Sequence, residues 1–259
     1  MSWQRKAGAV IVALVALAAV VSLVWTPYDP LQTEVVARLQ GSSPAHWMGT
    51  DQFGRDIASR VMDGARLTLT VAVGAVALSG LVGVPLGIWA GMRRGASRVV
   101  MAGADLLLAF PALLLAIVFT AVFGASIWIV VLAIGIAGIP AFVRVARAGT
   151  MQVIQRDYIL AARIAKVSGP AIAWRHVLPN IWPLVLTQVS VAVALAILAE
   201  AGLSFLGLGA PAPYASWGRM LQASQPYLAT SPHLALWPGA AIALTVLGFN
   251  LLGNADDRR

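Results

Sequence analysis

Six long stretches of this chain are apolar and nearly free of charge, and this pattern most restricts what it can fold into. A transmembrane helix needs about 20 predominantly apolar residues, because it faces lipid and must satisfy its backbone hydrogen bonds internally. Only 11% of the residues are charged and the mean hydropathy is +0.83, whereas a soluble domain carries about 25% charged residues. The sequence therefore predicts an all-α integral membrane protein. Its six expected spans are residues 7–25, 67–92, 99–123, 127–143, a stretch within 181–208, and 234–252.

The first stretch has two interpretations. It follows Arg5 and Lys6, as the apolar part of a signal peptide would, but it ends in a poor match to a small-x-small cleavage site. We therefore expect an uncleaved anchor, followed by a polar external segment. This divides the chain into residues 1–66, the anchor with the external segment, and residues 67–259, a core with the other five spans and a loop at about 144–180.

Basic residues are distributed unevenly between the two sides of this topology. With the N-terminus inside, thirteen of the 18 Lys and Arg residues fall in inner segments and five in outer segments. Lys and Arg collect in the cytoplasmic loops of membrane proteins, so the bias predicts that both termini are cytoplasmic. The same bias accounts for the net charge of +8. We therefore expect membrane lipid around the chain and no nucleic-acid partner.

Residue types that several kinds of chemistry require are missing from the sequence. The chain has no cysteine, and its three histidines lie far apart, which argues against a metal site. A P-loop needs a lysine directly after a glycine, so that both can cradle phosphates; the two lysines, Lys6 and Lys166, follow arginine and alanine. We therefore expect no enzyme activity, no metal and no cofactor in this chain, and any ATP energy must come from other subunits.

Residues 144–180 form a polar, basic segment that is too long for a simple connection between spans. Small or aromatic residues recur on one helical face: Tyr158, Ala161, Ala162 and Ala165. Basic residues fall on another face: Arg156, Arg163 and Lys166. Gly169-Pro170 is expected to break this helix, and a second short helix over residues 171–177 to follow. Periodicity alone is satisfied by amphipathic helices on the inner membrane surface, although the alanine face would also allow another protein to approach closely.

The same segment resembles the coupling-loop signature of ABC importer permeases, which reads Glu-Ala-Ala, three residues, Gly, nine residues, Ile-x-Leu-Pro. Ala161-Ala162 fall at its two alanines and Leu178-Pro179 at its end. Leu160 stands in place of the glutamate and Lys166 in place of the glycine, so we expect Gly169 to make the turn. The resemblance implies an ATPase-coupling loop made of Tyr158, Leu160, Ala161, Ala162, Arg163, Lys166, Gly169, His176, Leu178 and Pro179.

Further blocks resemble the C-type permease subunits of dipeptide, oligopeptide and nickel ABC importers, over nearly the whole chain. These blocks are residues 46–56, 59–60, 64–66, 105–111, 198–209, 216–218, 237–239 and 249–253. The resemblance implies a type I, MetI-like permease fold with six transmembrane helices and cytoplasmic coupling helices. It implies a pore shared with a second homologous permease, one or two ATPase subunits that bind ATP and Mg²⁺, and a substrate-binding protein at the outer face. The implied location is the bacterial cytoplasmic (inner) membrane, and the implied cargo is di- or oligopeptides or similar small solutes.

Two acidic residues, Asp105 and Glu200, are expected inside spans, where a charge is costly and marks a candidate functional site. Asp105 could line the translocation path or pair with a basic residue near the inner surface, and we prefer the pairing; the candidates are Arg93, Arg94 and Arg98. Glu200 could line the path or support the contact between permeases, and we prefer the structural role. Outside the membrane, turn-forming residues within 49–56 predict an ordered cap rather than a binding site.

Two other classes of membrane protein are alternatives. A stand-alone secondary transporter or channel would favour inverted repeats with interrupted spans, and the sequence shows no clear internal repeat. A membrane-embedded enzyme would need several catalytic residues at one depth, and only Asp105 and Glu200 are candidates.

Overall fold

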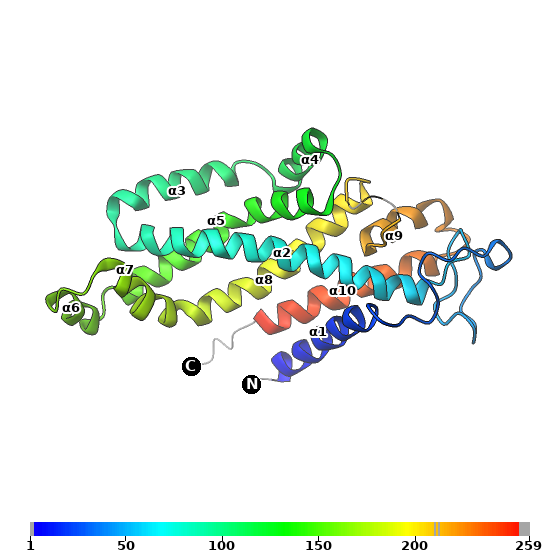
Figure 1. Cartoon of the computed structure of the whole chain (residues 1–259), viewed down its shortest axis with the longest axis horizontal. Helices are drawn as coiled ribbons and strands as arrows, with labels where there is room; N and C mark the ends of the chain where they lie inside the picture. Colours follow the sequence, from blue (N-terminus) through cyan, green and yellow to red (C-terminus); the bar gives the residue numbers. More distant parts are fainter. Residues whose placement is uncertain (1–2, 210, 212, 254–259) are drawn as a thin grey trace.

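The computed structural model describes residues 3–209, 211 and 213–253, which form a bundle of helices joined by loops (Figure 1). Its long helices are α1 (Trp3–Val21), α2 (Ile57–Met92), α5 (Ile127–Val153), α8 (Leu178–Phe205) and α10 (His233–Gly253). The shorter ones are α3 (Arg94–Leu108), α4 (Ala112–Phe123), α6 (Asp157–Ile164), α7 (Gly169–Ile172) and α9 (Trp217–Ser224), with the single turns η1 (Val35–Ala37), η2 (Ala173–Val177) and η3 (Gln225–Tyr227). The all-α prediction is confirmed for the described residues.

The apolar helices agree with the predicted spans in number. Five helical segments are long and apolar enough to cross a membrane, one of them the continuous run Gly169–Phe205. The count reaches six when α3 and α4, which are bent by 79° at a short break, are taken together as one span. The third predicted span, residues 99–123, is therefore broken.

Proline chemistry explains where the break in this span lies. Pro111 has no backbone N–H to donate, and its ring disfavours helical geometry in the residue before it. Accordingly α3 ends at Leu108, and Pro111 precedes the first residue of α4, Ala112. The Pro111 carbonyl still accepts a hydrogen bond from the Leu115 N–H at 3.0 Å, so the new helix begins at once in a different direction.

Two helices extend beyond the apolar stretches that predicted them. α2 begins at Ile57 rather than at residue 67, because the Asp56 carboxylate caps it by accepting a hydrogen bond from the Ser59 N–H at 2.8 Å. The predicted division at residue 66 therefore falls inside α2. α5 continues to Val153 rather than ending at residue 143, because charged residues lower hydropathy without stopping a helix.

Small residues let α2 and α5 lie in close contact. Gly83, Gly87 and Gly91 stand one turn apart on the face of α2 that meets α5. A Cβ atom at Gly87 would lie 2.6 Å from the Val143 carbonyl oxygen and 2.7 Å from the Ala146 Cβ. Small residues at four-residue spacing are a common way for membrane helices to approach, and here they fix the pair at the centre of the bundle.

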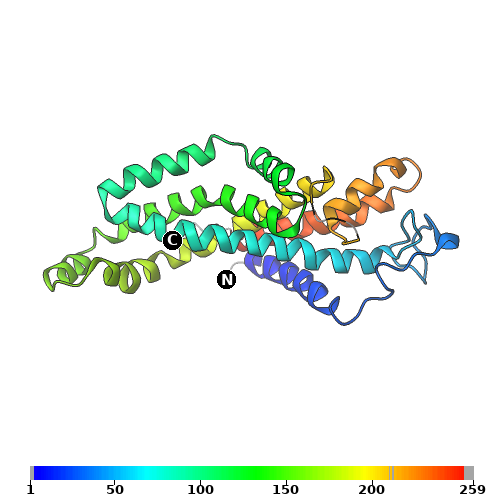
Figure 2. The same cartoon turned by 45° about the horizontal axis from the view of Figure 1, so that its top comes forward.

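The polar segments gather at opposite ends of the bundle. α6 and α7 lie at one end, next to the turn from α2 to α3, and α9 lies with the loops of residues 26–56 at the other (Figures 1 and 2). We call these the α6 end and the α9 end. α1 packs beside α10, along the side of the bundle away from α3 (Figure 1).

Candidate functional site

The predicted coupling loop protrudes at the α6 end (Figure 1). Ile159 is fully buried and anchors α6 to the bundle. On the outer side of the helix Leu160 is 59% and Ile164 75% exposed, and Ala161 is exposed between them. Ala162 is half-buried. The segment thus presents small and apolar side chains outward.

α6 ends by a Schellman motif rather than at Gly169-Pro170, so the predicted position of the break is wrong. The Val167 N–H donates to the Ala162 carbonyl and the Lys166 N–H donates to the Arg163 carbonyl, both at 3.0 Å. Lys166 has φ 59°, the left-handed conformation that glycine adopts most easily. Lys166 therefore makes the turn at the place where the signature has glycine, and Gly169 begins α7 instead.

This geometry predicts that Lys166→Gly stabilises the segment. A left-handed conformation costs a non-glycine residue about 1–2 kcal/mol, and glycine at this position removes that cost. Part of the stability gained is offset by the greater freedom of glycine in the unfolded chain. We expect the amides of residues 165–168 to exchange hydrogen about threefold more slowly, measured by mass spectrometry on the purified protein. Lys166→Ala is the matched control, because it removes the charge and keeps the strain; equal protection in both variants would contradict the prediction.

The second half of the loop runs directly into α8. Residues Gly169–Ile172 are helical, η2 is a single wide turn, and the helix continues without a gap into α8. Val177 is fully buried, while Leu178 is half-buried and Pro179 lies in the first turn of α8, where proline is tolerated. The His176 ring lies 6.2 Å from that of Tyr158. The second half of the loop is therefore continuous with α8.

Asp105 pairs with Arg144, the first residue of the predicted loop 144–180. Its carboxylate accepts a hydrogen bond from the Arg144 guanidinium at 2.7 Å. The prediction of a partner among Arg93, Arg94 and Arg98 is therefore wrong. Those residues lie at the beginning of α3, seven or more residues before Asp105, whereas the extension of α5 brings Arg144 alongside it.

Glu200 lies inside the chain, between α2 and α8. Its side chain is 2% exposed and accepts hydrogen bonds from the Ser204 hydroxyl at 2.6 Å and the Thr68 hydroxyl at 3.2 Å. In this arrangement Glu200 joins two helices of one subunit.

Replacing Glu200 should therefore affect folding first. Glu200→Ala leaves two buried hydroxyls without their acceptor. Each unsatisfied buried group lowers the free energy of unfolding by about 1–3 kcal/mol. Glu200→Gln keeps an acceptor oxygen and the shape, so we expect it to lose less than half as much stability. The measurement is the apparent melting temperature by size-exclusion chromatography after heating; equal melting of both variants would speak against this role.

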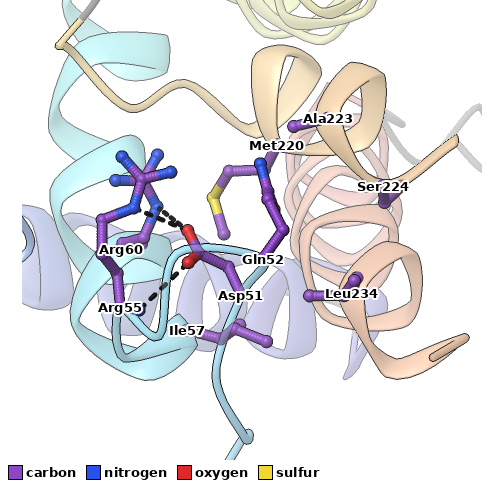
Figure 3. A pocket seen from close by; sticks show the side chains of 9 residues that line it. All are labelled: Asp51, Gln52, Arg55, Ile57, Arg60, Met220, Ala223, Ser224 and Leu234. Atoms are coloured by element: carbon purple, nitrogen blue, oxygen red, sulfur yellow. Dashed lines mark hydrogen bonds and ion pairs between the residues drawn. The ribbon is translucent and has the colours of Figure 1, made fainter. Parts of the chain in front are cut away.

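A second polar cluster lies at the α9 end (Figure 3). The Asp51 carboxylate accepts hydrogen bonds from Arg55 Nε at 2.7 Å and from the Phe53 N–H at 2.8 Å, and Arg60 Nε lies 3.5 Å away. The cavity beside it, also lined by Met220, measures about 20 Å³, which is room for about one water. The cluster ties its own loops together, as expected for an ordered cap.

The sequence did not predict a large apolar groove between α2 and α8. The groove measures about 1080 Å³. Its walls include Val84 and Ile88 of α2, Val185 and Val189 of α8, and Phe249 of α10. Its residues come from α2, α5, α7, α8 and α10 and from the η2 turn. They look like ordinary lipid-facing positions in the sequence, so only their packing reveals a common surface. Among the described residues, no group of three or more His, Asp or Glu could hold a metal ion.

Comparison with known proteins places this geometry in a family. Residues 83–255 match the family described as binding-protein-dependent transport system inner membrane component. A glutathione transport system permease protein of Pectobacterium atrosepticum is 41% identical over 230 residues, which are 88% of this chain and 76% of the relative. A dipeptide transport system permease protein of Alkalihalophilus pseudofirmus is 38% identical, over 95% of this chain and 82% of the relative.

A solved structure supports the fold independently. The crystal structure of an amino acid ABC transporter with histidines aligns with a TM-score of 0.55, covering 75% of this chain and 91% of that one at 17% identity. With a shared fold, close sequence relatives and a family match over most of its length, the chain belongs to the binding-protein-dependent inner membrane components and is a permease subunit of an ABC transporter.

Proposed function

We propose that the chain is one of two permease subunits of an ATP-driven importer of di- or oligopeptides in the bacterial cytoplasmic membrane. A second homologous permease completes the pore, ATPase subunits with ATP and Mg²⁺ bind at the α6 end, and a substrate-binding protein delivers cargo at the α9 end. Both termini lie on the cytoplasmic side. The names of the relatives, for dipeptide and glutathione transport, support this class of cargo.

The outward face of α6 is the observation that carries the proposal. Ile159 holds α6 in place while Leu160, Ala161 and Ile164 face away from the bundle. Exposed apolar side chains mark a surface for another protein or for a membrane, and contact with an ATPase subunit is what the proposal requires of them. The positive-inside bias puts this same end in the cytoplasm, where ATP is available.

Purification of the native complex tests the proposal. A tagged chain extracted from its own membrane in mild detergent should bring with it a second permease and one or two proteins with P-loops, identified by mass spectrometry. The co-purified binding protein should carry peptides when its bound ligand is released and analysed. A chain that is purified alone and transports solute without ATP would show the alternative, a stand-alone transporter or channel.

A smaller effect is expected at Leu160, where the signature has glutamate. Leu160→Glu restores a charge at an exposed position of α6, and a surface ion pair contributes about 0–1 kcal/mol. We expect substrate-stimulated ATP hydrolysis by the reconstituted complex to rise by about two- to fivefold. Leu160→Gln introduces a side chain of the same shape as glutamate but without its charge, and it should not raise the rate of ATP hydrolysis. An unaltered rate in Leu160→Glu would contradict the prediction that a charge at this position strengthens the contact with the ATPase.

A further inference from the structure

The apolar groove between α2 and α8 has one polar end. It runs from Arg93, the residue directly after α2, along the helices to Val73 of α2 and Phe249 of α10. Between Trp89 and Val73 the α2 wall covers sixteen residues, roughly 24 Å along the helix axis. One leaflet of a bilayer contributes about 15 Å of hydrocarbon, so the groove is long enough to hold a lipid acyl chain.

A single cation lies at the polar end. Among the described residues that line the groove, Arg93 is the only charged one, and its side chain is exposed. The five ion pairs within the described part of the chain are formed by other side chains. A guanidinium has five N–H donors and binds phosphate through two parallel hydrogen bonds. The charge of Arg93 is therefore complementary to a phosphate at the end of an apolar groove.

Three tryptophans line the same end of the groove. Trp89 lies in the last turn of α2, Trp174 in η2 and Trp182 near the beginning of α8, and each is at least 50% exposed. Tryptophan is enriched at the level of lipid headgroups, because its ring is apolar and its N–H is polar. The lining thus changes from aliphatic walls to indoles and then to a cation. A phospholipid changes in the same order, from acyl chain to glycerol backbone to phosphate.

The groove wall differs from the surface through which α2 packs against another helix. The contact with α5 uses Gly83, Gly87 and Gly91, and small residues of this kind let membrane helices approach closely. The groove wall of α2 instead presents mainly larger side chains, such as Val84 and Ile88. A flexible acyl chain needs no such close approach, so the wall favours a lipid over a helix of another subunit.

We propose that this groove binds an anionic phospholipid of the surrounding membrane. An acyl chain lies along α2 and α8, the glycerol backbone lies among the three tryptophans, and the phosphate binds Arg93. Basic pockets between transmembrane helices bind anionic headgroups in this way. The lipid would touch α2, η2 and α8 at once, next to the segment that leads from the predicted coupling loop into α8. The inference requires only that the chain lies in a membrane, and it is independent of the cargo.

The first test asks where the lipid binds. Phosphatidylglycerol with a photoreactive diazirine in one acyl chain is added to the complex in mild detergent, and the labelled peptides are identified by mass spectrometry. We expect labels on residues 84–88 and 185–193, in the groove walls. The exposed face of α1, with Leu14 and Leu17, is the control for ordinary lipid contact. Equal labelling of α1 and the groove would overturn the proposal.

The second test asks whether the headgroup is recognised together with the chain. Unlabelled phosphatidylglycerol should suppress the groove labels, and phosphatidylcholine, which has no net charge, should compete about fivefold more weakly. Glycerol 3-phosphate and inorganic phosphate lack the acyl chain and should not compete at the same concentration. Competition by either of them would show a plain anion site and overturn the proposal.

The third test uses variants of the polar end and of the wall. Arg93→Gln should weaken binding of phosphatidylglycerol by about tenfold, because a hydrogen bond between charged groups is lost. Arg98→Gln removes an exposed charge at the same end, outside the groove, and should change binding by less than about twofold. Equal binding by the two variants would contradict a role of Arg93.

Val189→Trp fills the groove from α8 and should abolish its labels, whereas Leu186→Trp adds the same ring to α8 outside the groove and should leave them. Arg93 lies at the surface, so the comparison of the arginine variants decides the matter even where Val189→Trp lowers the yield. Groove peptides that are labelled in the chain purified alone but not in the complex would show that the second permease covers the groove. That result would also overturn the proposal.

Discussion

A chain with Ala161→Arg should insert into the membrane in normal amounts and lose its ATPase subunits on purification. Ala161 is exposed on the protruding face of α6, so an arginine there does not disturb the bundle itself. In a docked complex it would place an unpaired charge in a surface that is complementary to a methyl group, and an uncompensated buried charge costs about 3–5 kcal/mol. The affinity for the ATPase should therefore fall by about 100-fold or more.

The measurement is the amount of ATPase that co-purifies with the tagged chain in mild detergent. Gly95→Arg is the matched control, because it adds the same charge at the same end of the bundle, in a place where an added Cβ meets nothing within 4 Å. Ala162→Arg should show the same loss, with some destabilisation of α6 since Ala162 is half-buried. Undiminished ATPase in Ala161→Arg would mean that α6 is only a connector on the membrane surface.

The second large effect is expected from Gly87→Val, in the contact between α2 and α5. The new Cβ would lie 2.6 Å from a backbone carbonyl oxygen, that of Val143, which cannot move without shifting α5. Overpacking of this kind costs about 1–3 kcal/mol, occasionally more, and a β-branched side chain brings further atoms into the same contact. We expect the apparent melting temperature to fall by about 5 °C or more, and less of the protein to elute as a single species.

Gly80→Val is the control for this variant. Gly80 lies on the same helix, but an added Cβ there would be 3.7 Å from the Phe142 ring, an ordinary contact. Any general effect of replacing a glycine in α2 is therefore common to both variants. Equal melting of the two would show that the close approach of α2 and α5 does not determine the stability of the bundle.

The two predictions concern features that differ in how far the sequence could reveal them. The segment that forms α6 was singled out from its spacing and from its resemblance to a known signature, down to Ala161 and Ala162. The stripe of Gly83, Gly87 and Gly91 was not recognised, because 24 glycines are spread through the chain and only packing shows which of them touch another helix.

Local conformation was partly predictable. The break at Pro111 follows from the chemistry of one residue, whereas the turn at Lys166 was assigned to Gly169 because glycine adopts the left-handed conformation most easily. The structure gives that conformation to a lysine, since the hydrogen bonds that close α6 require it at residue 166 whatever side chain stands there.

The sequence by itself determined that the chain lies in a membrane, that it has six apolar segments, and that the polar segment 144–180 is too long for a simple connection between spans. These properties follow from hydropathy and residue spacing. Both depend only on residues that are close together in the sequence. Only the tertiary structure decided that Asp105 pairs with Arg144, 39 residues away, that Glu200 joins α2 to α8, and that α2 and α8 enclose a groove. Contacts of this kind depend on how helices rotate and slide against one another, and that is settled by packing over the whole bundle rather than by any single stretch of chain.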